Sequence, residues 1–99
     1  MGPQPPRITF QTLRTLSAFC SRPAEEFSGA EIMESTGLSS GTLYPILMRL
    51  DEAGWLESRW EKVDPARVGR PRRRLYRITA LGRRCYVVAT DSLHSQAPT

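Results

Sequence analysis

The chain has 99 residues, which suit one small domain and exclude an enzyme built from two. Its composition, 39% hydrophobic and 24% charged, is that of an ordinary globular protein, and no apolar run approaches the ~18 residues that span a bilayer. The net charge of +4 is informative mainly through its position along the chain. We expect a cytoplasmic protein without membrane contact, whose modest core would gain stability from a partner subunit.

The positive charge is concentrated in one segment. Between Arg59 and Arg77 there are eight basic residues and two acidic ones, so this segment carries +6 and the remainder of the chain −2. Such a block is typical of a polyanion site, because neutralised phosphates release their condensed counterions. A solvated basic loop is the competing interpretation, and charge alone does not decide between the two.

The sequence offers no chemistry for catalysis. It has no nucleophile paired with a base, no glycine loop that would cradle a phosphate, and no metal-ligand spacing. Cys20 and Cys85 lie in apolar helical patterns, which suits buried, reduced thiols in a cytoplasm. We therefore expect neither an enzyme nor a bound metal or cofactor.

Three helices are expected in the first half of the chain. The first spans residues 9–21. The second opens at Ser28, whose hydroxyl can cap the helix, and must end by Gly37, which tolerates the positive φ of a helix end. The third follows Ser39 and closes at Gly54. Two short helices joined by a tight turn are the sequence form of a helix-turn-helix.

The third helix has two distinct faces. An apolar stripe, predicted to be buried, consists of Leu43, Ile46, Leu47 and Leu50. The opposite face carries no acid in its N-terminal half, so this half would enter a DNA groove, with Tyr44 able to reach a base edge or a phosphate. Pro45 lies on the same face, where it removes one helical hydrogen bond at a cost of ~3 kcal/mol. We interpret it as a feature of a functional site, with a tolerated kink as the alternative.

A β-ribbon follows the third helix. Residues 55–62 and 72–78 alternate as strands around a turn rich in proline and glycine. Placing Glu57 opposite Arg77 gives one consistent antiparallel register. A ribbon after a helix-turn-helix is a wing, and the basic segment covers its tip and both arms.

The predicted fold class is therefore mainly α with a small β-ribbon, a winged helix-turn-helix domain over residues 9–79. Polar tails are expected at 1–8 and 94–99. We expect Trp55 and Trp60 to lie in the core rather than to stack on bases, because they follow the third helix closely and are remote from the wing tip.

A last helix is expected over residues 80–93, capped by Thr79. Its apolar residues span an arc of ~160°, wider than the ~100° that one packing partner needs. We expect part of this arc to form a dimer interface, for which the candidates are Leu13, Leu81, Cys85, Val88 and Ala89. Packing of the whole arc on the first helix of the same chain is the alternative.

The run GAEIMESTGLSSGTLYPILMRLDEAGWLESRWE, followed by GRPRRRLYRITALG, resembles the PadR family of bacterial winged-helix transcriptional repressors. The resemblance covers residues 28–82, and its elements follow the family's order and spacing. Larger members carry a separate helical dimerisation domain, whereas this chain stops after one helix. It therefore resembles the short subfamily, in which the final helix dimerises.

The resemblance implies a homodimer that binds an inverted-repeat operator on double-stranded DNA. The DNA-reading motif of the family falls here on Ser39, Ser40, Thr42, Tyr44 and Pro45. Phosphate contacts fall on the wing, at Arg70, Arg72 and Arg73, and the adjoining Arg74 is expected to join them. Some members of the short subfamily bind aromatic or drug-like effectors at the dimer interface, but this sequence identifies none. The alternative function is a winged helix used for protein contacts or as a nonspecific architectural DNA binder.

Overall fold

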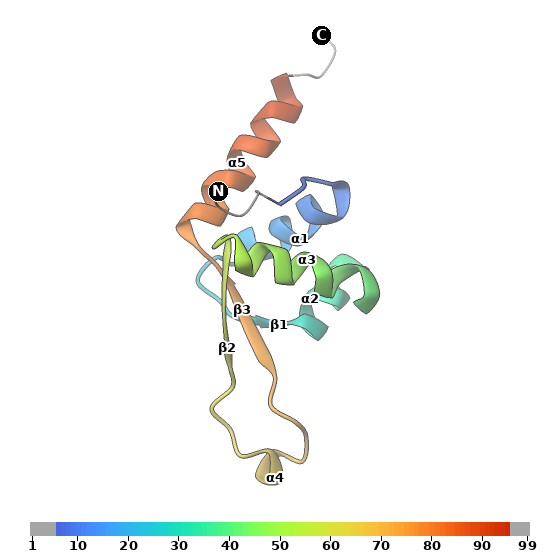
Figure 1. Cartoon of the computed structure of the whole chain (residues 1–99), viewed down its shortest axis with the longest axis vertical. Helices are drawn as coiled ribbons and strands as arrows, with labels where there is room; N and C mark the ends of the chain where they lie inside the picture. Colours follow the sequence, from blue (N-terminus) through green and yellow to red (C-terminus); the bar gives the residue numbers. More distant parts are fainter. Residues whose placement is uncertain (1–5, 96–99) are drawn as a thin grey trace.

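The computed structural model describes the backbone of residues 6–95 and the side chains of residues 6–92. A body of three helices carries two projections, a long ribbon formed by β2 and β3 and the helix α5, which leave it in opposite directions (Figure 1). Most of the predicted tail at 94–99, and residues 1–5 of the tail at 1–8, lie outside the described residues. In the part of the chain that the structure describes, no helix is long and apolar enough to cross a membrane.

The helices of the body lie within the ranges expected from the sequence. They are α1 (Phe10–Cys20), α2 (Gly29–Thr36) and α3 (Ser40–Glu52). At the start of α2, the Ser28 hydroxyl accepts from the Glu31 amide at 3.2 Å, and the Glu31 carboxylate accepts from the Ser28 amide at 2.9 Å. This capping box satisfies two backbone donors that a helix leaves unpaired. The helix ends at Gly37, whose φ of 75° is left-handed.

The core lies between the three helices and the base of the ribbon. Its buried residues are Leu16, Phe19, Ile32, Leu43, Ile46, Leu47, Leu50, Trp55, Leu56, Tyr76 and Ile78. The predicted apolar stripe of α3 is thus confirmed, and it fixes which face of that helix remains exposed. Cys20 and Cys85 are free thiols, as expected, but both are half-buried rather than fully buried.

The sheet has three antiparallel strands in the order β1-β3-β2. The strands β2 (Leu56–Trp60) and β3 (Arg74–Ile78) pair in the predicted register, with Glu57 opposite Arg77. The sequence did not predict β1 (Phe27–Ser28), which pairs with β3, because two residues show no measurable alternation. This short strand holds the start of α2 against the wing.

A turn of helix closes the far end of the ribbon. The segment α4 (Pro65–Val68) begins at Asp64, whose carboxylate accepts from the Ala66 amide at 3.0 Å. It ends at Gly69 with φ 71°. The sequence predicted a turn here, and the structure shows that Asp-Pro at its start and Gly at its end act as helix caps.

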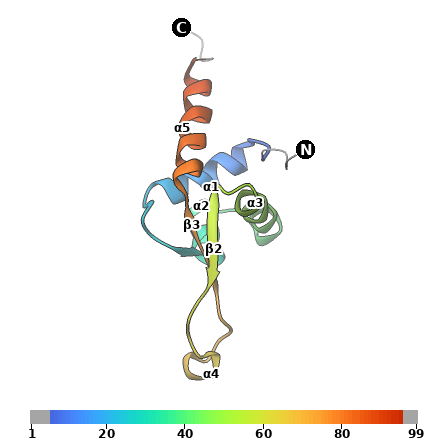
Figure 2. The same cartoon turned by 60° about the vertical axis from the view of Figure 1, so that its left-hand side comes forward.

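The last helix, α5 (Ala80–Ser95), begins at the base of the wing and extends away from the body (Figure 2). Thr79 caps it as predicted, because its hydroxyl accepts from the Gly82 amide at 3.0 Å. Gly82 is buried, and a side chain there would overlap the Trp55 carbonyl. The helix therefore crosses the start of β2 at close range before it packs along α1.

Candidate nucleic-acid interface

The N-terminal half of α3 exposes the small polar residues that the sequence singled out. Ser39, Ser40, Thr42 and Pro45 are all exposed. Ser39 occupies the N-cap position, but its hydroxyl donates to the Thr42 hydroxyl at 3.2 Å rather than capping a helical amide. These hydroxyl groups remain accessible at the positive end of the helix dipole, which favours anionic ligands.

Pro45 lies inside α3, and the helix continues through it from Ser40 to Glu52. A proline at this position offers no amide to the carbonyl four residues earlier, at Gly41. Gly41 is exposed, and a side chain there would meet no other atom within 4 Å. The exposed face of α3 therefore carries no side chain at Gly41, one turn before the proline ring.

Tyr44 leaves the exposed face of α3 and turns toward α2. Its side chain is partly exposed, at 43%, and its ring lies directly against the backbone of Gly29. A methyl group built on Gly29 would lie 2.5 Å from the tyrosine Oη atom. The phenol of Tyr44 therefore lies over the start of α2.

Trp60 is exposed, and the expectation that both tryptophans lie in the core is wrong for this one. Trp55 is 8% exposed, whereas Trp60 is 56% exposed. The strand alternation places Trp60 on the same side as Leu56, but burial along β2 decreases from Leu56 toward the wing tip as the ribbon leaves the body. The Arg74 guanidinium lies over the Trp60 ring, 5.3 Å from its centroid, in a cation–π contact.

Arg74 is held in place by polar contacts as well. Its guanidinium donates to the Ser58 hydroxyl at 2.8 Å and lies 3.8 Å from the Asp51 carboxylate. The Ser58 hydroxyl in turn donates to Asp51 at 2.5 Å. This network joins the C-terminal end of α3 to both strands of the wing, so it fixes the angle between the helix and the ribbon.

A groove of about 370 Å³ lies between the start of α2, α3 and the wing. Its lining residues are Ser28, Gly29, Ala30, Tyr44, Trp60, Arg72, Arg73, Arg74 and Tyr76. Burial is the main cause that raises the pKa of the Tyr76 phenol, so the neutral hydroxyl persists at physiological pH. The groove thus combines aromatic faces, hydroxyl groups and cationic side chains.

Glu61 organises the basic residues nearer the wing tip. Its carboxylate accepts two hydrogen bonds from Arg70, at 2.7 and 3.2 Å, and one from the Arg73 amide at 2.8 Å. The side-chain hydrogen bond from Arg70, followed by the backbone one from Arg73, lowers the pKa of Glu61 to about 2. The charge of Arg70 is therefore partly compensated within the protein.

The wing tip retains unpaired positive charge. Among residues 6–92, four basic side chains of the ribbon form no ion pair within 4 Å, namely Lys62, Arg67, Arg72 and Arg73. Arg72 donates only to the carbonyl of Val63, at 3.0 Å. Four arginines were predicted to contact phosphates. Arg72 and Arg73 form no ion pair and remain able to bind a phosphate, whereas Arg70 and Arg74 pair with carboxylates of the protein.

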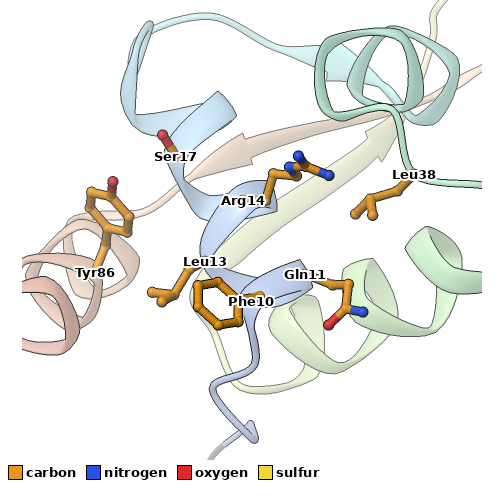
Figure 3. A pocket seen from close by; sticks show the side chains of 7 residues that line it. All are labelled: Phe10, Gln11, Leu13, Arg14, Ser17, Leu38 and Tyr86. Carbon is orange, nitrogen blue, oxygen red and sulfur yellow. The ribbon is translucent and has the colours of Figure 1, made fainter. Parts of the chain in front are cut away.

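A second surface runs between α1 and α5. A pocket of about 530 Å³ there is lined mainly by residues of α1, and α5 contributes Tyr86 to its lining (Figure 3). Phe10, at its edge, is 86% exposed. Ala89 and Leu13 line an adjoining pocket.

The outer side of α5 leaves other apolar residues without cover. Val88 is 68% exposed and Leu81 is 41% exposed, whereas Cys85 packs partly against the core. Val87, which the sequence did not single out, is also exposed. Within the described residues, the packing of α5 on α1 therefore covers only part of its apolar arc.

Five of the nine residues that line the groove were not predicted from the sequence to belong to a binding site, namely Ser28, Gly29, Ala30, Trp60 and Tyr76. Gly29 carried no visible signal, because its neighbour Tyr44 is remote in sequence. The position of Trp60 in a basic arm of the wing was the signal that could have found it. Residues 6–92 contain no group of three or more His, Cys, Asp or Glu side chains that could hold a metal ion.

Comparisons with known proteins agree with this architecture. The model of the transcriptional regulator PadR-like family matches residues 27–87, from β1 into α5. The chain therefore belongs to this family of DNA-binding transcriptional regulators, rather than to a family of enzymes. A comparison with curated proteins finds no match.

Solved structures share the fold at low sequence identity. A PadR family transcriptional regulator from Eggerthella lenta is 24% identical with a TM-score of 0.67, and the match covers 82% of this chain and 71% of that one. A transcriptional regulator from Clostridium thermocellum is 22% identical with a TM-score of 0.67, covering 86% and 81%. The disulfide form of AbfR is 23% identical with a TM-score of 0.71, where 92% of this chain spans 61% of the other.

Proposed function

We propose that this chain is a sequence-specific transcriptional repressor that binds an inverted-repeat operator as a homodimer. The observation that carries the proposal is that α3, whose N-terminal half exposes hydroxyl groups, shares a groove with the unpaired arginines Arg72 and Arg73 of the wing through Tyr44. One element could then enter the major groove while the other follows the phosphates of the same duplex. Such a protein would act in the cytoplasm, where operator DNA lies.

The base-reading residues would lie on the first half of α3. Ser39, Ser40 and Thr42 present small donors and acceptors, and Pro45 adds an apolar surface of the kind that contacts a thymine methyl group. The acidic residues of this helix, Asp51 and Glu52, are in its last turn. Their position favours an approach to DNA by the N-terminal end of the helix.

The phosphate contacts would come mainly from Arg72 and Arg73. Arg70 and Arg74 would contribute less charge, because Glu61 and Asp51 are their partners within the protein. In this assignment residues 9–79 bind DNA, and the basic wing supplies the part of the affinity that does not depend on sequence.

The homodimer would form through α5 and the adjoining face of α1. Support comes from apolar side chains that the monomer leaves exposed or half-buried, the proposed interface being Leu13, Leu81, Cys85, Val88 and Ala89. Contiguous exposed apolar surface of this kind marks interaction sites. A two-fold axis would place two copies of α3 about one helical turn of DNA apart, ~34 to 36 Å.

Selection from a library of random duplexes tests the proposed function. The purified chain should enrich an inverted repeat, and its complex with that duplex should survive a large excess of mixed-sequence DNA. A chain that enriches no sequence, and whose complexes are lost to any competitor DNA, would be an architectural binder. A chain that retains no duplex would point to protein contacts instead.

A further inference from the structure

The backbone conformation of Gly29 does not require a glycine, but the space around it does. It is the first residue of α2 and is buried, and it is not among the glycines with positive φ, which are Gly37, Gly54 and Gly69. Any residue could therefore adopt its backbone conformation. The obstacle to a side chain is Tyr44, because a methyl group at position 29 would lie 2.7 Å from the ring atoms Cε1 and Cζ and 2.5 Å from Oη.

The contact with Gly29 determines where the phenol of Tyr44 lies. The ring rests on the bare backbone at the start of α2 and lines the groove that it shares with Trp60, Arg72 and Arg73. The exposed hydroxyls of α3, which belong to residues 39, 40 and 42, are not among the residues that line this groove. Tyr44 thus lines the same groove as residues of the wing, whereas the hydroxyl groups that would meet base edges do not.

The chemistry of the groove suits a sugar-phosphate chain. A phenol and two exposed guanidinium groups can donate to phosphate oxygens, and the exposed ring of Trp60 offers an apolar surface to a deoxyribose. Arg74 lies over this ring and is fastened to Ser58, so the aromatic wall is fixed before a ligand arrives.

We propose that this groove binds one phosphodiester of the DNA backbone, that Tyr44 contacts this phosphate rather than a base, and that Gly29 is the positioning residue that keeps the phenol there. The proposal rests on the proposed function, since it assumes that the ligand is DNA. It predicts that the Tyr44 contact contributes equally on every DNA sequence.

The test compares four proteins, the wild type, Gly29→Ala, Tyr44→Ala and the double variant. Each is titrated with the selected inverted repeat and with a mixed-sequence duplex. Each single variant should weaken binding to both duplexes by the same factor, about 12- to 160-fold, the range of one hydrogen bond to a charged group. Gly29→Ala should have no further effect in the Tyr44→Ala background, because no ring is left to displace.

The slope of log K against log salt should not change in these variants, because tyrosine carries no charge and its loss leaves the number of neutralised phosphates the same. Helicity and thermal melting are measured alongside, and alanine favours a helix more than glycine does. If Gly29→Ala does not fold, Tyr44→Phe removes the hydroxyl alone and should show the same loss on both duplexes.

Three results would overturn the inference. They are a loss confined to the selected duplex, additive effects of the two substitutions, and full affinity of Tyr44→Phe. In each of these the wild type still binds DNA, so the proposed function stands. A wild type that binds neither duplex refutes the proposed function itself, and the two failures are therefore distinguishable.

Discussion

At the scale of single residues, the arginines of the wing differ in whether their guanidinium groups already pair with a carboxylate of the protein. Arg70 and Arg74 lie within 4 Å of a carboxylate, whereas Arg72 and Arg73 do not. Sequence alone could count these charges but could not assign their partners, because Glu61 and Asp51 reach them across strands or from another element. The number of phosphates that the wing can bind therefore depends on how many of its arginines pair with carboxylates of the protein, as well as on how many arginines it has.

Arg72→Ala and Arg73→Ala should each flatten the slope of log K against log salt on mixed-sequence DNA by up to about one, because each removes a charge that can displace a counterion. Arg74→Ala should change the slope less, since its guanidinium is held by Ser58 and Asp51. Fluorescence titrations over a series of salt concentrations measure this. Equal flattening by all three substitutions would show that the internal contacts of Arg74 open on DNA.

Glu61→Gln should make DNA binding more salt-dependent. It removes the carboxylate that pairs with Arg70 and thereby adds one net positive charge to the wing, so the slope should steepen by up to about one. Glu57→Gln is the matched control, because it removes the same charge from the Arg77 pair at the base of the ribbon. A shallower slope in Glu61→Gln would mean that the carboxylate serves only to shape the wing.

The depressed pKa of Glu61 also predicts how wing stability depends on pH. Because its folded pKa is about 2, below the ordinary value of 4.5, the ionised carboxylate stabilises the wing fully above pH 4.5. This contribution is lost as the pH falls from 4.5 through about 2. Hydrogen exchange at the Arg73 amide, followed by NMR, should therefore be slower in the wild type than in Glu61→Gln at pH 5. A difference that persists unchanged below pH 2 would contradict the assignment.

At the scale of elements, the features that could be predicted from the sequence are those that depend on short-range patterns. The cap at Ser28, the left-handed Gly37 and the pairing of Glu57 with Arg77 depend on residues close in sequence or on a strand period of two, and the structure confirms them. The strand β1 is too short to show an alternation, and the exposure of Trp60 depends on how far the ribbon extends past the body. That is a tertiary property, and no local pattern contains it.

Pro45→Ala should stabilise the fold while weakening specific binding. Alanine restores the amide that α3 lacks and removes the ring that crowds the Gly41 carbonyl, which should raise stability by about 1–3 kcal/mol, or ~4–8 °C in Tm per kcal/mol. Affinity for the selected duplex should fall if the proline ring contacts a base. Pro65→Ala is the control, because a proline at the first position of α4 displaces no helical hydrogen bond. A raised Tm with unchanged affinity would reduce Pro45 to a tolerated kink.

At the scale of the whole molecule, the two projections, the wing and α5, have different proposed functions. The wing and α3 would bind DNA, and α5 would join two copies. The width of its apolar arc left packing of α5 on α1 as the alternative to a dimer interface, and how much of that arc stays uncovered could not be predicted. Gly82 packs closely against the Trp55 carbonyl, and in this orientation of the helix Val88 and Leu81 are exposed.

Val88→Asp should convert the dimer into a folded monomer. The side chain is 68% exposed in the single chain, so a charge there disturbs the monomer little, but it would be buried without a partner between two subunits. Sedimentation should then show a mass of 11.2 kDa with unchanged helicity. Val68→Asp, at the wing tip, is a control that should leave the association state unchanged. A wild type that is itself monomeric at micromolar concentration would refute the proposed interface.

The most direct measurement is a hydroxyl-radical footprint on the duplex that the wild type selects, in the presence of excess mixed-sequence DNA. Two copies of α3 and two wings on one side of B-DNA should protect two equivalent patches on the same face, centred ~34 to 36 Å apart and related by the symmetry of the inverted repeat. The Val88→Asp monomer should lose both patches at the concentration where the wild type protects them. A single patch, or uniform protection that moves with the ends of the duplex, would contradict a dimeric, sequence-reading protein.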